Sequence, residues 1–235
     1  CGHIRLRRTS LTPSRYAPYA SGEYTMTICR IGVFYDGNYF MYAQRHYHHK
    51  RSLGWLNYQA FHQLIESFVR EKEQQFVAHR VVYASWHQGM FSSPNSTEKQ
   101  LRGDRNRDHD LMHAGIEAKY VPMNAAATKE KGVDVALAVD AMQIALSEKI
   151  DVAVIVTGDG DFVPLVRAIM KQGVRVAIVH FEYEDEGDKT FISERLRVAC
   201  NYALNVSDME RDRSKDALFR GLFRRVDKTP DANGA

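Results

Sequence analysis

The stretch DVAVIVTGDGDF, residues 151–162, places a run of apolar residues directly before two aspartates and two glycines. Residues 151–156 show no alternation of polar and apolar side chains, which is typical of a strand that is covered on both faces. In parallel sheets flanked by helices, ligands bind beyond the carboxyl ends of the strands. Asp159 and Asp161 would lie at that end, so the stretch predicts either a simple Gly/Asp turn or part of a metal site.

Apolar strand patterns and amphipathic helix patterns alternate along the chain on both sides of this stretch. The expected strands cover residues 28–35, 76–85, 117–121, 151–156 and 174–180, with Pro122 stopping the third one. The expected helices cover residues 56–73, 96–115, 133–147, 162–172 and 188–198. This alternation predicts an α/β fold of three layers, in which helices cover both faces of a central, mostly parallel sheet.

The composition is that of a globular protein, with 44% hydrophobic and 26% charged residues and a net charge of +3 over 235 residues. We expect one domain over residues 27–206. Residues 1–26 would be an extension that is disordered or not native to the fold, and residues 207–235 a polar tail with a short helix. Three cysteines without paired spacing favour a reducing, cytoplasmic setting. No apolar run reaches the roughly 20 residues of a membrane span. We therefore expect no membrane partner. The sequence leaves open whether the protein forms a homodimer.

Four carboxylates follow expected strands or open expected helices: Asp36, Asp134, Asp159 and Asp161. Clustered carboxylates raise one another's pKa, so a site that keeps them ionised requires a cation. Oxygen ligands without paired His or Cys favour Mg²⁺ or Mn²⁺, which can activate water for attack at phosphorus. Each aspartate alone could instead cap a helix or a turn. The four together favour the metal site, and capping is compatible with ligation.

Two further features lie outside this set. Asp140 falls mid-helix on an apolar stripe and therefore needs a partner. We interpret it as a structural hydrogen-bonding residue, with a supporting role at the site as the alternative. The histidines His46, His48 and His49 are too close in sequence to converge on one ion without distant ligands, so we assign no zinc site.

Three motifs in this order resemble the NYN domain, a member of the PIN-like ribonuclease superfamily, and its LabA-like branch most of all. They are Val33-Phe-Tyr-Asp-Gly-Asn-Tyr39, Lys131-Gly-Val-Asp-Val135 and Thr157-Gly-Asp-Gly-Asp-Phe162. The resemblance covers roughly residues 27–206, and three ordered motifs are more specific than any one of them. It implies a Rossmann-like, PIN-like fold.

The same resemblance implies a metal-dependent endoribonuclease that hydrolyses RNA phosphodiester bonds. The family's acidic positions fall on Asp36, Asp134, Asp159 and Asp161, as catalytic residues and metal ligands. Asn38 and Thr157 would orient water or phosphate. Lys131 could contact a phosphate or be an ordinary surface lysine. The alternative is a non-catalytic RNA-binding or regulatory module with the same fold.

Two basic stretches are candidates for contact with single-stranded or structured RNA. Residues 44–55 follow Asn38 and contribute Arg45, Lys50 and Arg51, while residues 99–107 contribute Arg102 and Arg105. Arg and Lys can neutralise phosphates, and Tyr47 or Trp55 could stack on unpaired bases. For Trp55 we favour packing in the core. Both stretches are also compatible with solvated surface.

Overall fold

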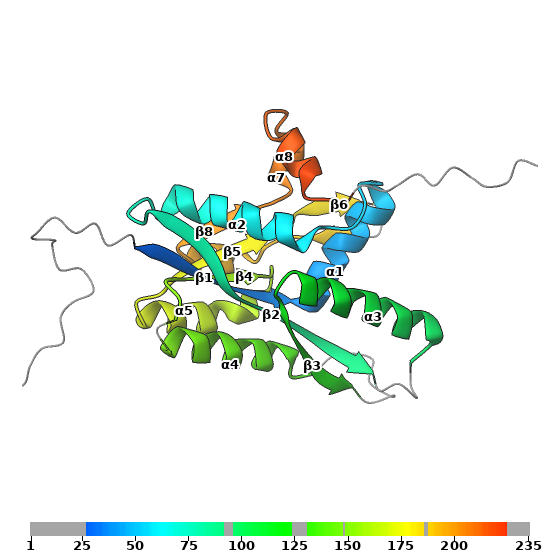
Figure 1. Cartoon of the computed structure of the whole chain (residues 1–235), viewed down its shortest axis with the longest axis horizontal. Helices are drawn as coiled ribbons and strands as arrows, with labels where there is room; N and C mark the ends of the chain where they lie inside the picture. The colour runs from blue at the N-terminus through cyan, green and yellow to red at the C-terminus, as the bar shows by residue number, and fades with distance from the viewer. Residues whose placement is uncertain (1–26, 92–95, 124–130, 148, 186–187, 225–235) are drawn as a thin grey trace, which may run out of the picture.

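A six-stranded sheet forms the centre of the structure, a computed structural model that describes residues 27–91, 96–123, 131–147, 149–185 and 188–224 (Figure 1). The strand order is β3-β2-β1-β4-β5-β8, and all neighbouring strands run parallel. The strands are β1 (Ile28–Asp36), β2 (Ala78–Phe91), β3 (Glu117–Met123), β4 (Val152–Val156), β5 (Arg175–His180) and β8 (Tyr202–Asn205). The expected extension at residues 1–26 and the end of the expected tail, residues 225–235, lie outside the described residues.

Helices cover both faces of this sheet (Figure 1). On one face lie α1 (Gly37–Arg45), a π-helical segment (His46–Lys50), α2 (Tyr58–Lys72) and α3 (Glu98–His113). On the other face lie α4 (Val133–Leu146), α5 (Val163–Lys171) and α6 (Glu194–Ala199). The predicted α/β fold of three layers is confirmed.

The alternation of side chains along β1 builds two hydrophobic cores at once. Val33 and Tyr35 pack under α1 and α2, whereas Phe34 packs under α4 and α5. All five residues of β4 are buried, which explains why that stretch has no polar alternation. Fully burying an aliphatic side chain contributes roughly 1.5–3 kcal/mol, so the central strands hold the sheet firmly.

Three predicted elements differ from the structure. The strand expected over residues 76–85 is β2, which begins at Ala78 and runs on to Phe91. The other two differ for identifiable reasons. β3 runs through Pro122, because β3 is bonded to β2 alone in the described sheet and an edge strand tolerates a residue without N–H. Residues 188–198 are not one helix. They form β7 (Asp188–Thr190), which pairs with β6 (Tyr183–Asp185), followed by α6. The backbone N–H of Ser193 donates to the carbonyl of Gly158 at 2.9 Å. This hydrogen bond holds Ser193 outside the helix, so α6 begins only at Glu194.

The C-terminal part of the described chain packs against the same core. It contains α7 (Asp208–Arg211) and α8 (Asp216–Gly221). Phe219, Leu222 and Phe223 are buried in the cluster that also holds α2. Phe223 forms an isolated antiparallel bridge with Leu56, so this segment also fixes the chain before α2.

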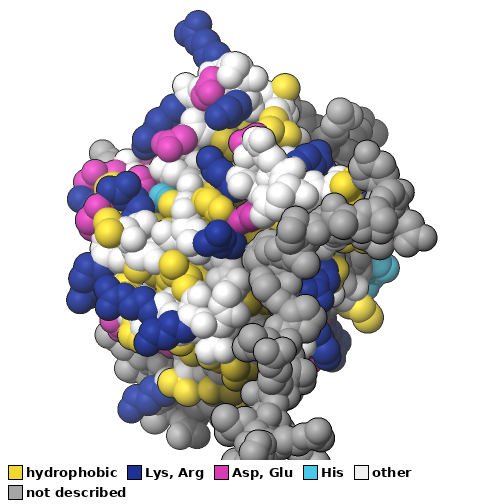
Figure 2. All heavy atoms as spheres, turned by 90° about the vertical axis from the view of Figure 1, so that its left-hand side faces the viewer, with side chains coloured by type: hydrophobic (Ala, Val, Ile, Leu, Met, Phe, Trp, Pro, Cys, Tyr) yellow, Lys and Arg dark blue, Asp and Glu magenta, His cyan; other side chains and the backbone are white. Residues whose placement is uncertain are grey.

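The surface carries basic residues at more than one place. Figure 2 looks towards the amino ends of the strands, where Lys and Arg side chains are interspersed with hydrophobic and acidic ones. Basic character alone therefore does not mark the carboxyl ends of the strands. None of the helices in the described part of the chain has the length and apolar character that a bilayer crossing demands.

Candidate active site

A buried threonine joins the carboxyl ends of β1 and β4. These strands are neighbours, with Tyr35 paired to Val156, so the residues that follow them emerge side by side. The hydroxyl of Thr157 donates to Oδ2 of Asp36 at 3.2 Å. Oγ1 of Thr157 in turn accepts from the backbone N–H of Asp159, also at 3.2 Å. Thr157 therefore connects two of the four predicted carboxylates.

Asp36 and Asp159 also act as caps. Oδ1 of Asp36 accepts from the backbone N–H of Tyr39 at 3.1 Å, at the start of α1. Oδ1 of Asp159 accepts from the N–H of Asp161 at 2.9 Å, in the 3₁₀ turn Gly160–Phe162. A carboxylate offers about four lone-pair sites, so a carboxylate that caps a helix or turn can still bind a cation. The structure thus shows capping and leaves ligation open at the same oxygens.

Asp134 belongs to the same electrostatic environment. It lies in the first turn of α4, and the cap of that helix is Gly132, with φ +83°. Partial burial, and then the charges of Asp159 and Asp161, hold the pKa of Asp134 above its ordinary value. The alternative that Asp134 caps its helix is wrong, because the cap position lies two residues earlier.

The donor set fits a hard divalent cation. The four groups are oxygen donors, and a cation would relieve the repulsion that raises the pKa of Asp134. Within the described ranges, no three His, Cys, Asp or Glu side chains come together closely enough to form a ready ligand cluster. The carboxylates would therefore have to draw together when they bind the ion.

Close approach of backbone explains two of the glycines at this site. A methyl group at Gly37 would lie 2.6 Å from the carbonyl oxygen of His87. A methyl group at Gly160 would lie 2.5 Å from Oγ of Ser193 and 3.8 Å from Nη2 of Arg195. Ser193 and Arg195 thus lie beside the turn that carries Asp159. Neither residue lies in a recognisable sequence motif, because only the fold brings α6 to this turn.

The other predicted supporting residues differ in their contacts. Oδ1 of Asn38 accepts from Nε2 of Gln88 at 3.4 Å, and Gln88 in turn accepts from the indole N–H of Trp86 at 3.0 Å. Asn38 is therefore held beside β2. Lys131 is exposed directly before Gly132, and no hydrogen bond or ion pair links it to the rest of the described chain.

Asp140 forms a buried polar network, which confirms its interpretation as a structural residue. Its carboxylate accepts from the hydroxyl of Tyr83 at 3.1 Å, from Nζ of Lys119 at 2.5 Å and pairs with Nε2 of His87 at 3.1 Å. Burial alone would raise the pKa of Asp140, but hydrogen bonds from His87, Lys119 and Ser85 hold it well below its usual range.

This network is not a nucleophilic triad, although it contains Ser, His and Asp. Ser85 and Asp140 both contact Nε2 of His87, and Nδ1 of His87 is buried without a partner among the described residues. A triad requires the acid and the nucleophile on opposite ring nitrogens. The network therefore anchors α4 to β2 and β3.

The predicted RNA-contacting residues are all exposed: Arg45, Lys50, Arg51, Arg102 and Arg105. Arg51 forms an ion pair with Glu210. The two aromatic predictions need correction. Tyr47 is fully buried against Phe181, Phe219 and Phe223, so it cannot stack on bases. Trp55 is 37% exposed, so the prediction that it packs in the core is wrong.

Comparison with known proteins agrees with this fold. The family model of the NYN domain matches residues 30–207. A crystal structure of a protein of unknown function from Vibrio parahaemolyticus is similar, with a TM-score of 0.52 and 22% sequence identity. The match covers 76% of this chain and 93% of that one, and it bears on the fold alone. No curated protein matches the sequence.

Proposed function

Because the chain belongs to the NYN domain family, we propose that it is a metal-dependent endoribonuclease that hydrolyses RNA phosphodiester bonds. We also assign it to the LabA-like branch, on the motifs around Asp36, Asp134 and Asp159. The observation that carries the proposal is the link between Asp36 and Asp159 through the Thr157 hydroxyl, with Asp134 electrostatically coupled to the same turn. Such strand-end carboxylates are suited to holding Mg²⁺ or Mn²⁺.

Each residue has a defined task in this proposal. The ion would be held by Asp36, Asp134, Asp159 and Asp161. When bound, it would activate water and stabilise negative charge on the phosphate oxygens. Thr157 fixes the carboxylate of Asp36 through its hydrogen bond. Asn38, as a hydrogen-bond donor, and Arg195, as a positive charge, would orient the phosphate.

A cleavage assay tests the proposal. Purified protein is incubated with end-labelled RNA in Mn²⁺ or in EDTA, and products are separated on a denaturing gel. We expect cleavage in Mn²⁺ that disappears in EDTA. Absence of cleavage in both conditions, with intact RNA binding, would replace the proposal by a non-catalytic RNA-binding or regulatory module.

One observation favours that second function. The carboxylates are not preassembled into a ligand cluster within the described residues, so the fold alone does not require an ion at this place. In a binding module, changing Asp36 or Asp159 to Asn would leave RNA affinity unchanged or raise it, because negative charge beside the phosphates is removed. Cleavage would then be absent from the wild-type protein as well.

A further inference from the structure

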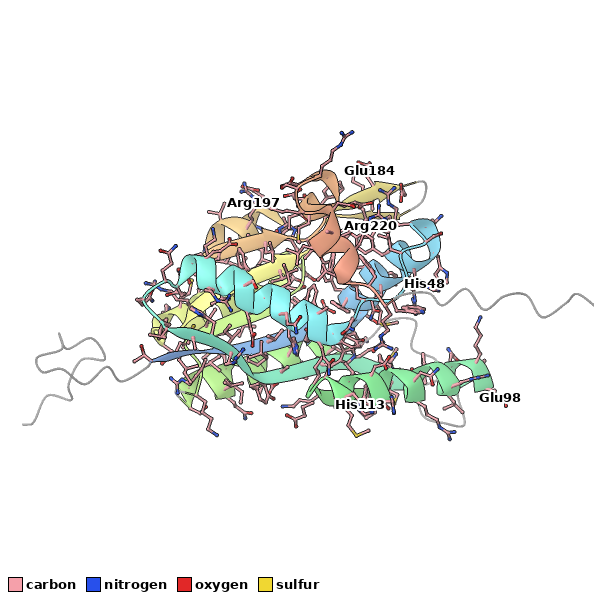
Figure 3. All side chains as sticks on the ribbon, turned by 45° about the horizontal axis from the view of Figure 1, so that its top comes forward. His48, Glu98, His113, Glu184, Arg197 and Arg220 are labelled. Carbon is pink, nitrogen blue, oxygen red and sulfur yellow. The ribbon has the colours of Figure 1, made fainter. Side chains whose placement is uncertain are left out.

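A groove lies between two parts of the chain: α3 forms one side, and α1 with the π-helical segment His46–Lys50 forms the other. We refer to it as the α1–α3 groove. Its volume is about 790 Å³, within the range of ligand sites in proteins. One wall contains Gln44, Arg45 and Trp55, and the other contains Lys99 and Arg107. Figure 3 shows His48 projecting from the segment after α1 towards α3, whose first turn carries Glu98.

The charge of the α1–α3 groove is positive. Among the described residues, four basic side chains line it, namely Arg45, Lys99, Arg107 and Arg224, against the two carboxylates of Asp104 and Asp110. Arg107 pairs with Asp104 at 2.6 Å and Arg224 pairs with Asp110 at 2.9 Å. No carboxylate in the described part of the chain forms a salt bridge with Arg45 or Lys99. These two charges remain available for an anionic ligand such as a phosphate backbone.

An aromatic ring lies in the same groove. Trp55 is 37% exposed and lines the cavity. The imidazole of His48 stacks on its indole, with ring centroids 4.3 Å apart and an interplanar angle of 19°. A tryptophan supported in this way is suited to stacking on an unpaired base. Bases in a duplex already stack on each other and do not offer a free face, so this feature favours single strands over duplexes.

Helix α1 connects the α1–α3 groove with the carboxylates, because its C-terminal turn lines the groove and its cap is one of them. Gln44 and Arg45 lie on α1, and the cap of that helix is Asp36. Gln44 lies eight positions after Asp36, which is roughly 12 Å along the helix axis. Stacked nucleotides of one strand are about 3.4 Å apart, so a few nucleotides would span this length of α1.

We propose that the α1–α3 groove binds single-stranded RNA beside the cleavage site. An unpaired base stacks on Trp55, and Arg45 and Lys99 contact flanking phosphates. This inference rests on the proposed function, because it takes RNA as the ligand. It names unpaired rather than duplex RNA as the substrate class.

The test measures RNA binding in EDTA, so that cleavage cannot interfere. Fluorescence anisotropy compares a labelled oligouridylate with a fully paired RNA duplex of the same length, using the full chain. Trp55→Ala is expected to weaken binding of the single strand about tenfold and to leave duplex binding unchanged. Trp55→Phe keeps a stacking ring and is expected to retain most of the affinity. Thermal unfolding of both variants shows that the fold is intact.

The charges are tested through the salt dependence of binding. The double variant Arg45→Ala with Lys99→Ala is expected to lower the slope of log affinity against log salt by about 1.4, since each phosphate contact on a single strand contributes about 0.7. The matched control is Arg167→Ala with Lys171→Ala, two exposed basic residues of α5 on the opposite face of the sheet. The control is expected to leave the slope unchanged.

Several results would overturn the inference. One is equal affinity of wild type and Trp55→Ala for the single strand, and another is an equal loss of affinity of Trp55→Ala for single strand and duplex. A third is a change of oligomeric state of Trp55→Ala in gel filtration, which would make the groove an interface between copies. Failure here is distinguishable from failure of the proposed function. Cleavage that survives Trp55→Ala but not Asp159→Asn would keep the nuclease and reject the groove. RNA binding that depends on Trp55 but is not followed by cleavage would keep the groove and reject the nuclease.

Discussion

The hydroxyl of Thr157 donates a hydrogen bond to Asp36 across the ends of β1 and β4, and it is fully buried. Thr157→Val keeps the shape of the side chain but removes this donor and leaves the N–H of Asp159 without its acceptor. We expect a loss of about 1–3 kcal/mol in the free energy of unfolding. We also expect metal-dependent cleavage to fall about tenfold to a hundredfold, the scale seen when partners of metal ligands are removed.

Thr157→Ser is the control for this prediction, because it keeps the hydroxyl. Its cleavage rate should stay close to that of wild type. Urea denaturation and single-turnover cleavage measure the two effects separately. If the Val and Ser variants were equally active, the hydrogen bond to Asp36 would have no part in the reaction.

Asp134 should destabilise the fold when no cation is bound. Its pKa is raised in the folded state, so its charge opposes folding above its unfolded pKa of about 4, and the effect vanishes as the pH falls below that value. Asp134→Asn should therefore raise the melting temperature in EDTA near neutral pH and have no such effect in acid. It should also reduce the rise in melting temperature that Mn²⁺ produces in wild type.

Glu98→Gln provides the matched control, because Glu98 is likewise an acid in the first turn of a helix. Removing a lone acid there should cost about 0.3–1 kcal/mol, which is the opposite sign. Differential scanning fluorimetry at the two pH values measures both variants. A melting temperature for Asp134→Asn that falls as it does for Glu98→Gln would contradict the proposed repulsion.

The network around Asp140 should control stability in acid. The pKa of Asp140 lies below its unfolded value, so its stabilisation is complete above about pH 4 and is lost as the pH falls towards the folded pKa. Asp140→Ala leaves Lys119 and His87 without their buried partner and should cost about 3 kcal/mol. Urea denaturation across this pH range should give a flatter profile for the variant than for wild type. An unchanged profile would show that the network contributes nothing.

Replacing two of the glycines by alanine should change the free energy of unfolding in opposite directions. At Gly37 the added methyl would meet the carbonyl of His87 at 2.6 Å, so Gly37→Ala should lower the free energy of unfolding by about 1–3 kcal/mol. At Gly103 in α3 nothing lies within 4 Å of the added methyl. Gly103→Ala should therefore raise the free energy of unfolding by about 0.5–1 kcal/mol. Thermal or urea unfolding of the pair checks the predicted difference in sign.

The sheet could be predicted from the sequence because its signal is local. The continuous apolar run at Val152–Val156 and the alternation along Ile28–Asp36 reflect burial that each strand carries in its own residues. The strand-end aspartates were also predictable, since a strand followed by Gly and Asp marks a turn at the ligand-binding edge. How far the carboxylates converge depends on turn geometry, which the local pattern does not encode.

Other features depend on contacts between distant segments. Trp55 has a sequence pattern typical of a core residue, but Phe223 and Leu222 from the C-terminal segment pair with its neighbours Leu56 and Asn57 and leave the indole at the groove. Arg195 reaches the turn at Gly160 because α6 packs beside it. No short motif could indicate either placement.

We propose that the strand-end carboxylates support RNA cleavage through a divalent ion. The decisive experiment measures the rate of Mn²⁺-dependent RNA cleavage by wild type, Asp36→Asn and Asp159→Asn. The control is Asp216→Asn, whose side chain is half exposed on α8. We predict that Asp36→Asn and Asp159→Asn lose activity on the order of a hundredfold. The control variant should cleave as wild type does, and RNA binding measured in EDTA should stay unchanged. Equal cleavage by wild type and both site variants, or cleavage that persists in EDTA, would contradict the account.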